Sequence, residues 1–378
     1  MEQPCFVWAR EEHGHDPRGR STQGASAPRV DEKLRTNTTS VSILTPTFNH
    51  ARFIEQCLSS VAAQTHRHWQ QLVIDDGSTD GTYEIARRWT DPRLRVDRQP
   101  HVGIFGLAAT YNAALHATDG EFVAILEGDD YWRPDKLEML LPAFRDPDVV
   151  LAYGRTTVVI GSRPSQRSIP DDSFARRFGA QALSNDPVGA AAIAMLDTGI
   201  PFTFPCSVVI RRSALEAIGG FKTAEGLGAV DYPTFLALAM AGRFAYVDRT
   251  VAYWRRHSDS GSWSTHLQAM HAVVEHSRTF VNEHGAGLGI GVDRTLALER
   301  VWQRRLQRAA FNSGRYLLLQ SRWREAREQF IRALGSSYPP IAASGAVGYV
   351  ASLAHRDLEG ILAALGRVSF PSQRMAKR

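Results

Sequence analysis

The sequence predicts an α/β protein in which a mostly parallel β-sheet is flanked by helices and followed by a helical C-terminal extension. Two observations carry this prediction. From residue 41 to residue 160, short apolar segments alternate with segments of helical periodicity, which is the order of βαβ units. Polar clusters at 45–49, 75–80 and 127–130 follow three of the apolar segments. Ligands bind at the carboxyl edge of such sheets, so these clusters are expected to converge on a site.

Composition narrows the class of protein. The chain has 378 residues, 43% of them hydrophobic and 22% charged, which is ordinary for a globular protein of about two to three domains and excludes a fibrous or fully disordered chain. The three cysteines, Cys5, Cys57 and Cys206, are too far apart for a disulfide framework or a CxxC motif and suit the reducing cytoplasm. No apolar run reaches the ~18 residues of a membrane span.

The first half of the chain reads as alternating elements. Residues 1–40 lack apolar periodicity and are expected to form a disordered leader; without an apolar core segment they are not a secretory signal. Apolar runs predict strands at 41–45, 71–75, 94–96, 122–126 and 149–160. Helical spacing predicts helices at 53–64, 82–89 and 107–117, and Pro134 suits the first turn of another helix.

The second half is less regular. Prolines at 164, 170 and 187 predict an irregular segment over 163–199. A strand at 207–210, a helix from Ser213, a helix at 232–241 and a strand at 244–247 are then expected, followed by a loop at 257–262. The predicted organisation is a leader at 1–40, a catalytic-type α/β domain at 41–264, and a helical extension with a basic terminus at 265–378.

The helical extension is rich in arginine. Between residues 299 and 332 there are nine arginines against three glutamates. Gly314, Ala326, Phe330 and Ala333 have the spacing of one tetratricopeptide-like helix pair, but one repeat cannot bury its own faces. The favoured prediction is therefore two helices packed back on the main domain, and the alternative is a partner-binding array.

Carboxylates at the predicted sheet edge indicate a cation site. Asp75, Asp76, Glu127, Asp129 and Asp130 all follow strands. Clustered carboxylates repel one another, and hard oxygen ligands suit Mg²⁺ or Mn²⁺, which also bind substrate phosphates. The alternative for Asp75 and Asp76 is turn formation through local hydrogen bonds. The combination favours a metal–diphosphate site.

Three motifs carry a resemblance to a known family. The stretches VSILTPTFN at 41–49, VIDDGSTDGT at 73–82 and LEGDDYW at 126–132 resemble a family 2 glycosyltransferase of the GT-A fold, over roughly residues 41–257. The resemblance implies a nucleoside-diphosphate sugar as donor, most simply a UDP-sugar, a divalent metal ion (Mn²⁺ or Mg²⁺), and an inverting single displacement. The acceptor implied is a hydroxyl of a glycan, lipid-linked or other molecule in cell-envelope polysaccharide synthesis.

The same resemblance implies the binding residues. Asp129, Asp130 and His257 are implied as metal ligands, with Asp129 also at the sugar or ribose. The chain departs from the family pattern at four positions. Phe48 replaces the frequent tyrosine, and His101 replaces the usual asparagine. Glu127 replaces the first aspartate of the DxD motif, and Val230 replaces the glutamate of the common Glu-Asp pair. The implied donor-binding residues are Thr45, Pro46, Phe48, Asn49, Asp75, Asp76, Gly103, Asn112, Glu127, Asp129, Arg255 and Arg256. For Glu127, a purely structural role at the strand end is the alternative.

Asp231 matches the catalytic base of the family. It follows the glycine-rich stretch 225–230 and precedes the predicted helix, so it is expected to deprotonate the acceptor hydroxyl. The alternative is that Asp231 caps that helix. Glu225 is the next candidate for the base.

Two other functions compete with glycosyl transfer. A nucleotidyltransferase of similar fold would need a loop rich in Gly and Lys after the first strand to bind a triphosphate. The segment at 45–51 contains neither residue type. A non-catalytic scaffold would use the arginine-rich tail as its interaction surface. The net charge of +5 does not indicate nucleic acid, and it fits an anionic substrate or weak peripheral association with the inner face of a membrane.

Overall fold

The structure is a computed structural model that describes residues 40–160, 163–169, 172–257 and 266–358. Residues 1–39 of the predicted leader, the predicted loop beyond His257, and the basic terminus from residue 367 lie outside the described residues. The prediction of a division at residues 40 and 264 stays a prediction.

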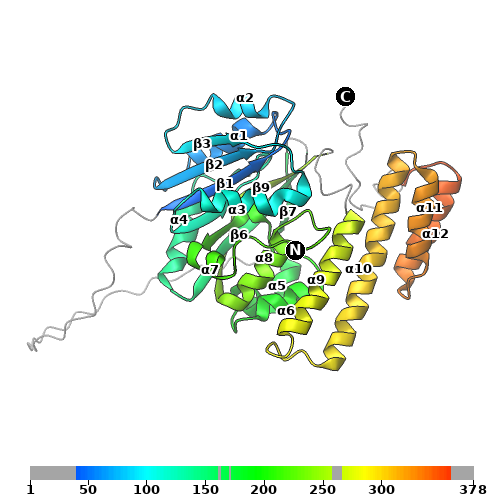
Figure 1. Cartoon of the computed structure of the whole chain (residues 1–378). Helices are drawn as coiled ribbons and strands as arrows, with labels where there is room; N and C mark the ends of the chain where they lie inside the picture. The colour runs from blue at the N-terminus through cyan, green and yellow to red at the C-terminus, as the bar shows by residue number, and fades with distance from the viewer. Residues whose placement is uncertain (1–39, 161–162, 170–171, 258–265, 359–378) are drawn as a thin grey trace, which may run out of the picture.

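One mixed sheet forms the centre of the protein, which confirms the predicted α/β class (Figure 1). Its strand order is β3-β2-β1-β4-β8-β6-β9-β5, with β7 paired to β6. The pairs β1–β2, β2–β3, β1–β4 and β6–β9 are parallel, whereas β8 is antiparallel to both of its neighbours. The strands are β1 (Val41–Thr47), β2 (Trp69–Asp75), β3 (Leu94–Arg98), β4 (Phe122–Ile125), β5 (Tyr131–Trp132), β6 (Val149–Ile160), β7 (Arg163–Ile169), β8 (Val208–Arg211) and β9 (Arg243–Arg256).

Helices cover both faces of the sheet. Because side chains alternate along a strand, Ile43 packs with one core and Leu44 with the other. The helices are α1 (Ile54–Ala62), α2 (Thr82–Arg87), α3 (Leu107–His116), α4 (Lys136–Leu140), α5 (Asp172–Ser184), α6 (Ala190–Thr198), α7 (Arg212–Ala217), α8 (Asp231–Ala241), α9 (His266–His284), α10 (Val292–Leu319), α11 (Trp323–Leu334) and α12 (Pro339–Leu353). Helices α1 and α4 pack on the Ile43 side, and α3, α6, α8 and α9 on the Leu44 side.

The predicted irregular segment 163–199 is wrong. It contains β7, α5 and α6. Pro187 precedes α6 instead of interrupting it, and the alanine-rich run that starts at Ala190 has high helix propensity. Pro164 lies within β7, where it is paired with Val159 of β6, and Pro187 lies between α5 and α6.

The predicted strand 244–247 is also much too short. Strand β9 runs for 14 residues and pairs with β6 along its length through several register shifts. The residues between Val247 and Val251 look like a break in sequence because they are polar and partly exposed. This strand carries Trp254, Arg255 and Arg256 to the carboxyl ends of β1 and β4.

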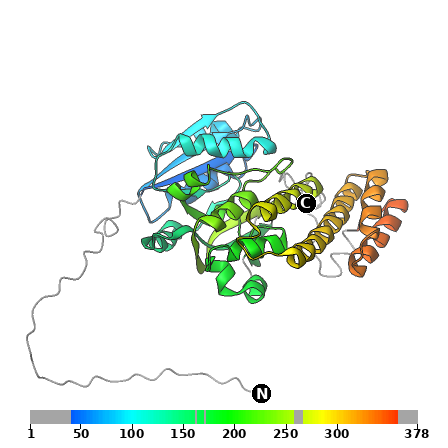
Figure 2. The same ribbon diagram turned by 60° about the horizontal axis from the view of Figure 1, so that its bottom comes forward.

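The helical extension differs from the favoured prediction. Leu298 and Trp302 in the first half of α10 join the main core, and the Trp302 indole donates to the backbone oxygen of Leu196 at 2.9 Å. Helices α11 and α12 instead pack on the second half of α10 around Phe330, in a separate small core. Figures 1 and 2 both show α11 and α12 on the side of α10 away from the sheet. Among the described residues, no helix is long and apolar enough to span a membrane.

Candidate active site

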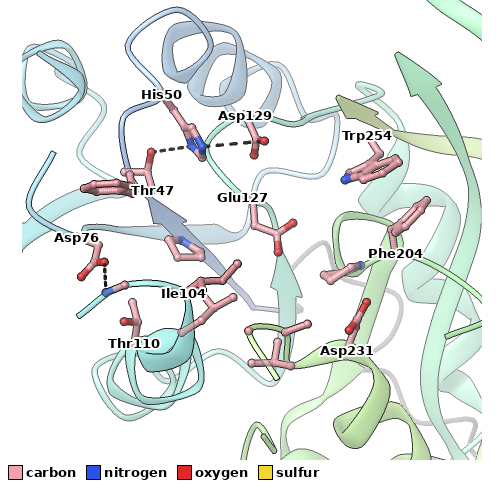
Figure 3. A pocket seen from close by; sticks show the side chains of 18 of the residues that line it. Thr47, His50, Asp76, Ile104, Thr110, Glu127, Asp129, Phe204, Asp231 and Trp254 are labelled. Atoms are coloured by element: carbon pink, nitrogen blue, oxygen red, sulfur yellow. Dashed lines mark hydrogen bonds and ion pairs between the residues drawn. The ribbon is translucent and has the colours of Figure 1, made fainter. Parts of the chain in front are cut away.

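A cavity of about 520 Å³ opens at the carboxyl ends of β1, β2 and β4. Its walls come from segments that are distant in sequence, as the strand order predicts. The residues lining it are Pro46, Thr47, Phe48, His50, Asp76, His101, Gly103, Ile104, Leu107, Thr110, Glu127, Asp129, Phe204, Pro205, Gly228, Ala229, Val230, Asp231 and Trp254. Figure 3 shows Glu127 between a wall with His50 and Asp129 and a wall with Asp231.

Asp129 lies between two histidines. Its Oδ2 is 3.1 Å from Nε2 of His257 and 3.9 Å from Nε2 of His50. His50 is itself oriented by Thr47, whose Oγ1 is 3.2 Å from Nδ1 of His50. Gly128 allows this close approach, because a Cβ there would lie 2.3 Å from Oγ1 of Thr47. His50 was not predicted from the sequence, although it directly follows the first motif.

The three side chains form a donor set for a divalent cation. One ligand atom from each of His50, Asp129 and His257 lies within 4.8 Å of the others, and this is the one such group among the described residues. Burial lowers the pKa of His50, which favours the neutral imidazole that binds metal. Burial raises the pKa of Asp129, but His50 and His257 outweigh it and hold that pKa below its usual value. The arrangement fits a cation bound by one carboxylate and two imidazoles.

Asp130 and Arg255 hold the backbone next to these three side chains in place. The buried Asp130 carboxylate accepts the backbone N–H of Arg255 at 2.8 Å. Arg255 donates to the backbone oxygen of Asp129 and, at 2.6 Å, to Oε1 of Gln56. Asp130, Arg255 and Arg256 do not line the cavity. Asp130 therefore ties the β4 motif to β9, which differs from its expected place at the metal.

Glu127 lies in the cavity wall in a setting that disfavours its charge. Burial, followed by the charge of Asp129, raises the pKa of Glu127 to about 8. The Tyr111 hydroxyl donates to Oε1 of Glu127 at 3.0 Å and opposes that shift. Without a bound cation, Glu127 is thus mostly protonated at neutral pH.

Asp231 is the first residue of α8 and faces the cavity (Figure 3). Burial raises its pKa to about 6. Val230 is the N-cap of α8, and no side chain caps the helix. The Asp231 carboxylate accepts the N–H of the adjacent Tyr232 at 2.8 Å. The capping alternative for Asp231 therefore does not fit the structure.

The glycine-rich loop before α8 is packed against the opposite wall. A Cβ on Gly228 would lie 2.7 Å from a side-chain carbon of Ile104, so a larger residue could not approach so closely. The buried Tyr232 anchors the start of α8 through its hydroxyl, 2.8 Å from Oγ of Ser277 in α9. Together these contacts fix the position of Asp231. Glu225, the second candidate for the base, does not line the cavity.

Two aromatic side chains form the wall beside Asp231. The rings of Phe204 and Trp254 stack with centroids 4.3 Å apart. The backbone next to Phe204 is held by Trp132 Nε1 and Lys136 Nζ, which donate to the oxygen of Cys206 at 2.7 and 2.8 Å. Neither ring was predicted as a site residue. Phe204 lies outside every motif, so the sequence carries no signal for it.

The far end of the cavity has a second aromatic pair. Phe48 stacks on His101 with ring centroids 4.1 Å apart. Asp76 orders the loop around His101, since its carboxylate accepts the N–H groups of Val102 and Gly103 at 2.9 and 3.0 Å. Pro46 and Gly103, which were also predicted to bind the donor, line the cavity as well.

Four predicted donor-binding residues do not line the cavity, and each makes a hydrogen bond within the protein. Thr45 Oγ1 accepts from Gln71 at 2.9 Å, and Asn49 accepts the N–H of Thr79 at 2.9 Å. Asp75 accepts the N–H of Ser78 at 3.0 Å. Asn112 bonds the backbone of Phe221 through both its amide nitrogen and its oxygen. These hydrogen bonds hold together the segments next to the lining side chains.

Comparison with known proteins adds a family match. The model described as Glycosyl transferase family 2 matches residues 42–219. A Nostoc protein named as an uncharacterized glycosyltransferase is 25% identical over 259 residues, which cover 66% of this chain and 77% of that protein. The Escherichia coli UDP-Glc:alpha-D-GlcNAc-diphosphoundecaprenol beta-1,3-glucosyltransferase is 28% identical over 166 residues, which cover 44% of this chain and 64% of the enzyme. Chondroitin synthase of Pasteurella multocida is 28% identical, over 59% of this chain and 21% of the synthase. The match thus spans less than two-thirds of the length of the last two relatives.

Among solved structures, the Pyrobaculum calidifontis mannosyltransferase in complex with GDP-Man and Mn²⁺ is 22% identical to this chain. The alignment covers 86% of each chain with a TM-score of 0.49. Staphylococcus aureus TarS in complex with UDP-GlcNAc is 18% identical, with a TM-score of 0.47 over 87% of this chain and 92% of that one.

Proposed function

This chain belongs to glycosyl transferase family 2, whose model matches residues 42–219. We propose that it is a metal-dependent, inverting enzyme with Asp231 as its catalytic base. The coarse activity, transfer of a sugar from a nucleotide sugar, follows from the family. The observation that carries the finer proposal is the cavity itself, in which Asp231 faces the His50–Asp129 wall across Glu127 (Figure 3).

The nucleoside of the donor is proposed to bind at the end of the cavity with Phe48 and His101. These stacked rings offer a π-face to a nucleobase, and Phe48 is 37% exposed and therefore accessible to a ligand. Asp76 keeps the loop in place beneath the base, because its carboxylate oxygens already accept backbone and side-chain donors. A UDP-sugar is the proposed donor.

A divalent cation is proposed to bind Asp129, His50 and His257. When bound, it would neutralise the diphosphate and stabilise the charge of the departing nucleoside diphosphate. Two imidazole ligands suit Mn²⁺ better than Mg²⁺, which prefers an all-oxygen shell. Arg255 and Asp130 act as positioning residues that hold the backbone and the strand next to Asp129.

The chain's own chemistry is proton transfer at Asp231. The acceptor hydroxyl oxygen attacks the anomeric carbon while its proton passes to the Asp231 carboxylate. The bond from the anomeric carbon to the diphosphate oxygen breaks, and the nucleoside diphosphate leaves with the electron pair. A pKa of about 6 keeps Asp231 mostly ionised at neutral pH and close to the optimum for a general base.

The acceptor is proposed to be a sugar that lies on the Phe204–Trp254 wall. The apolar face of a pyranose ring can stack on an aromatic ring, and these two line the cavity beside Asp231. A glycan or lipid-linked glycan of the cell envelope is therefore the proposed acceptor class. The named activity of the Escherichia coli relative supports a lipid-linked sugar.

A thermal-shift panel of nucleotide sugars tests this function. UDP-, GDP-, dTDP- and ADP-sugars are each added with Mn²⁺, with Mg²⁺ and with chelator. A ligand that binds only the folded state raises stability by ~2.7 kcal/mol at a hundredfold excess over its dissociation constant. We expect a UDP-sugar to raise the melting temperature only with a divalent ion, and most with Mn²⁺. A shift of equal size in chelator would contradict the metal dependence, and no shift with any nucleotide sugar would contradict the function.

A further inference from the structure

Helix α12 has an unusual distribution of side chains. No charged residue occurs between residues 339 and 354. A surface helix normally buries its larger apolar residues and exposes polar ones. Beyond the buried Ile341 in its first turn, helix α12 instead buries Gly345, Gly348 and Ser352. It exposes Val347, Val350 and Leu353, which are 54%, 63% and 55% exposed.

Close packing fixes this orientation. A Cβ on Gly345 would lie 2.8 Å from the backbone nitrogen of Leu334, and one on Gly348 would lie 2.3 Å from the ring of Phe330. Rotating α12 to bury Val347 or Val350 would therefore drive a branched side chain into α11. The valines face outward because only the glycine side fits against α11.

Helix α11 adds to the exposed apolar surface. Ile331 is 56% exposed and Leu334 is 38% exposed. We call Ile331, Leu334, Val347, Val350 and Leu353 the outer face. Figures 1 and 2 show α11 and α12 at the end of the molecule farthest from the sheet, where none of the drawn helices and strands covers them. Exposing these apolar side chains to water does not stabilise the isolated chain. Exposed apolar surface of this kind marks an interaction site, so we expect a partner to cover the outer face.

The charge of the surrounding region indicates the kind of partner. Residues 292–358 contain eleven arginines and no lysine against five acidic residues, a net charge of +6, whereas the whole chain carries +5. Arg324, Arg332 and Arg356 on and beside α11 and α12 are exposed. Two copies that met through the outer face would bring these like charges together, which costs free energy. An anionic lipid surface would attract them instead.

We propose that the outer face docks on the surface of an anionic lipid bilayer. Helix α12 is 15 residues long, or about 22 Å at 1.5 Å per residue, which is less than the ~30 Å of a bilayer core. It therefore lies in the headgroup region, with the valines in the acyl boundary and the arginines at the phosphates. This partner is additional to the transfer reaction, and its test does not depend on the proposed donor or acceptor.

Vesicle co-sedimentation of the full chain tests the proposal. The vesicles are phosphatidylcholine alone, or phosphatidylcholine and phosphatidylglycerol in equal amounts, at low and high salt. We expect binding to the anionic vesicles at low salt and weaker binding at high salt. The double variant Val347→Glu/Val350→Glu should lower the bound fraction at least about tenfold, because two valine side chains no longer enter the lipid.

A matched control separates the outer face from net charge. The double variant Val292→Glu/Leu296→Glu makes the same charge change at two exposed residues of α10, which are 78% and 52% exposed. It should bind vesicles within about twofold of the parent chain, since it removes only long-range attraction. Melting temperatures within error of the parent show that both variants fold.

Three outcomes would overturn the proposal. The first is no binding to anionic vesicles at low salt. The second is an equal loss of binding in the two double variants, which would assign the effect to charge alone. The third is a dimer by light scattering that Val347→Glu/Val350→Glu dissociates, with no vesicle binding by the parent. That result would identify a second copy of the chain as the partner of the outer face.

Discussion

Nε2 of His257 lies 3.1 Å from Oδ2 of Asp129, although 128 residues separate them in the sequence. The contact joins the end of β9 to the loop after β4. It also places His257 on the side of Asp129 where His50 lies, 3.9 Å from the same oxygen. The proposed metal site thus depends on the pairing of β9 in the sheet, because β9 leads directly into His257.

The first prediction concerns Asp231 as the base. Asp231→Asn keeps the size of the side chain and removes its basicity, so turnover to acceptor should fall by ~10²–10⁴-fold while donor binding is kept. The melting temperature should stay the same or rise, because burial disfavours the charged carboxylate that the substitution removes. Rates of transfer and thermal melts for Asp231→Asn and Asp231→Ala check this. Transfer by Asp231→Asn at the parental rate would exclude Asp231 as the base.

The second prediction concerns pH. Burial raises the pKa of Asp231 to about 6, and a general base works only when deprotonated. The rate of transfer should therefore fall as the pH is lowered through about 6. Between pH 7 and 8 the rate should be nearly constant, because Asp231 is already almost fully ionised there. The rate is measured at saturating Mn²⁺ and donor. If UDP binding falls over the same range, the pH effect belongs to the metal ligands instead of Asp231.

The third prediction separates two neighbouring aspartates. Asp129→Asn removes the proposed carboxylate ligand and should weaken Mn²⁺-dependent UDP binding by more than the ~10–100-fold typical of losing an outer-shell partner. Asp130→Asn should leave that binding nearly unchanged. Burial raises the pKa of Asp130 well above its usual value, and an amide oxygen can still accept the N–H of Arg255. Titration calorimetry with UDP and Mn²⁺ compares the two. The reverse order of effects would move the metal to Asp130.

The fourth prediction concerns His50. His50→Ala should weaken Mn²⁺-dependent UDP binding by at least the ~10–100-fold typical of losing an outer-shell partner, and excess Mn²⁺ should restore part of it, because one of three proposed ligands is lost. His116→Ala is the control, since His116 is exposed at the end of α3 and does not line the cavity. Equal metal affinity in the two variants would remove His50 from the metal site.

The fifth prediction concerns the aromatic wall. Trp254→Ala should raise the KM for acceptor by roughly 3–10-fold, the scale of one lost aromatic contact, and leave donor binding and metal-dependent donor hydrolysis near the parental level. Trp323→Ala is the control, because Trp323 stacks on His355 in the helical extension. A rise in the Kd for UDP instead of the acceptor KM would assign Trp254 to the donor.

The sequence alone determined the sheet and the location of the site. Short apolar runs that alternate with helical segments are typical of buried strands, so β1, β2 and β4 were predicted to within two residues at each end. The family resemblance placed Asp129 and Asp231 at the site, and both line the cavity. The prediction failed over 163–199, where Pro164 lies within β7 and Pro187 precedes α6, and over β9, where polar residues fall within a continuous strand.

Only the tertiary structure decided which polar side chains reach the cavity. Asp129 and Asp130 are adjacent in sequence, yet one faces His50 and the other is buried against the backbone of Arg255. Thr45 and Asn49 likewise bond to Gln71 of β2 and to the backbone of Thr79. Successive residues after a strand point in different directions, and their direction depends on which segment packs against them. The aromatic wall and the outward valines of α12 have the same origin, because both are set by contacts between segments that no local pattern encodes.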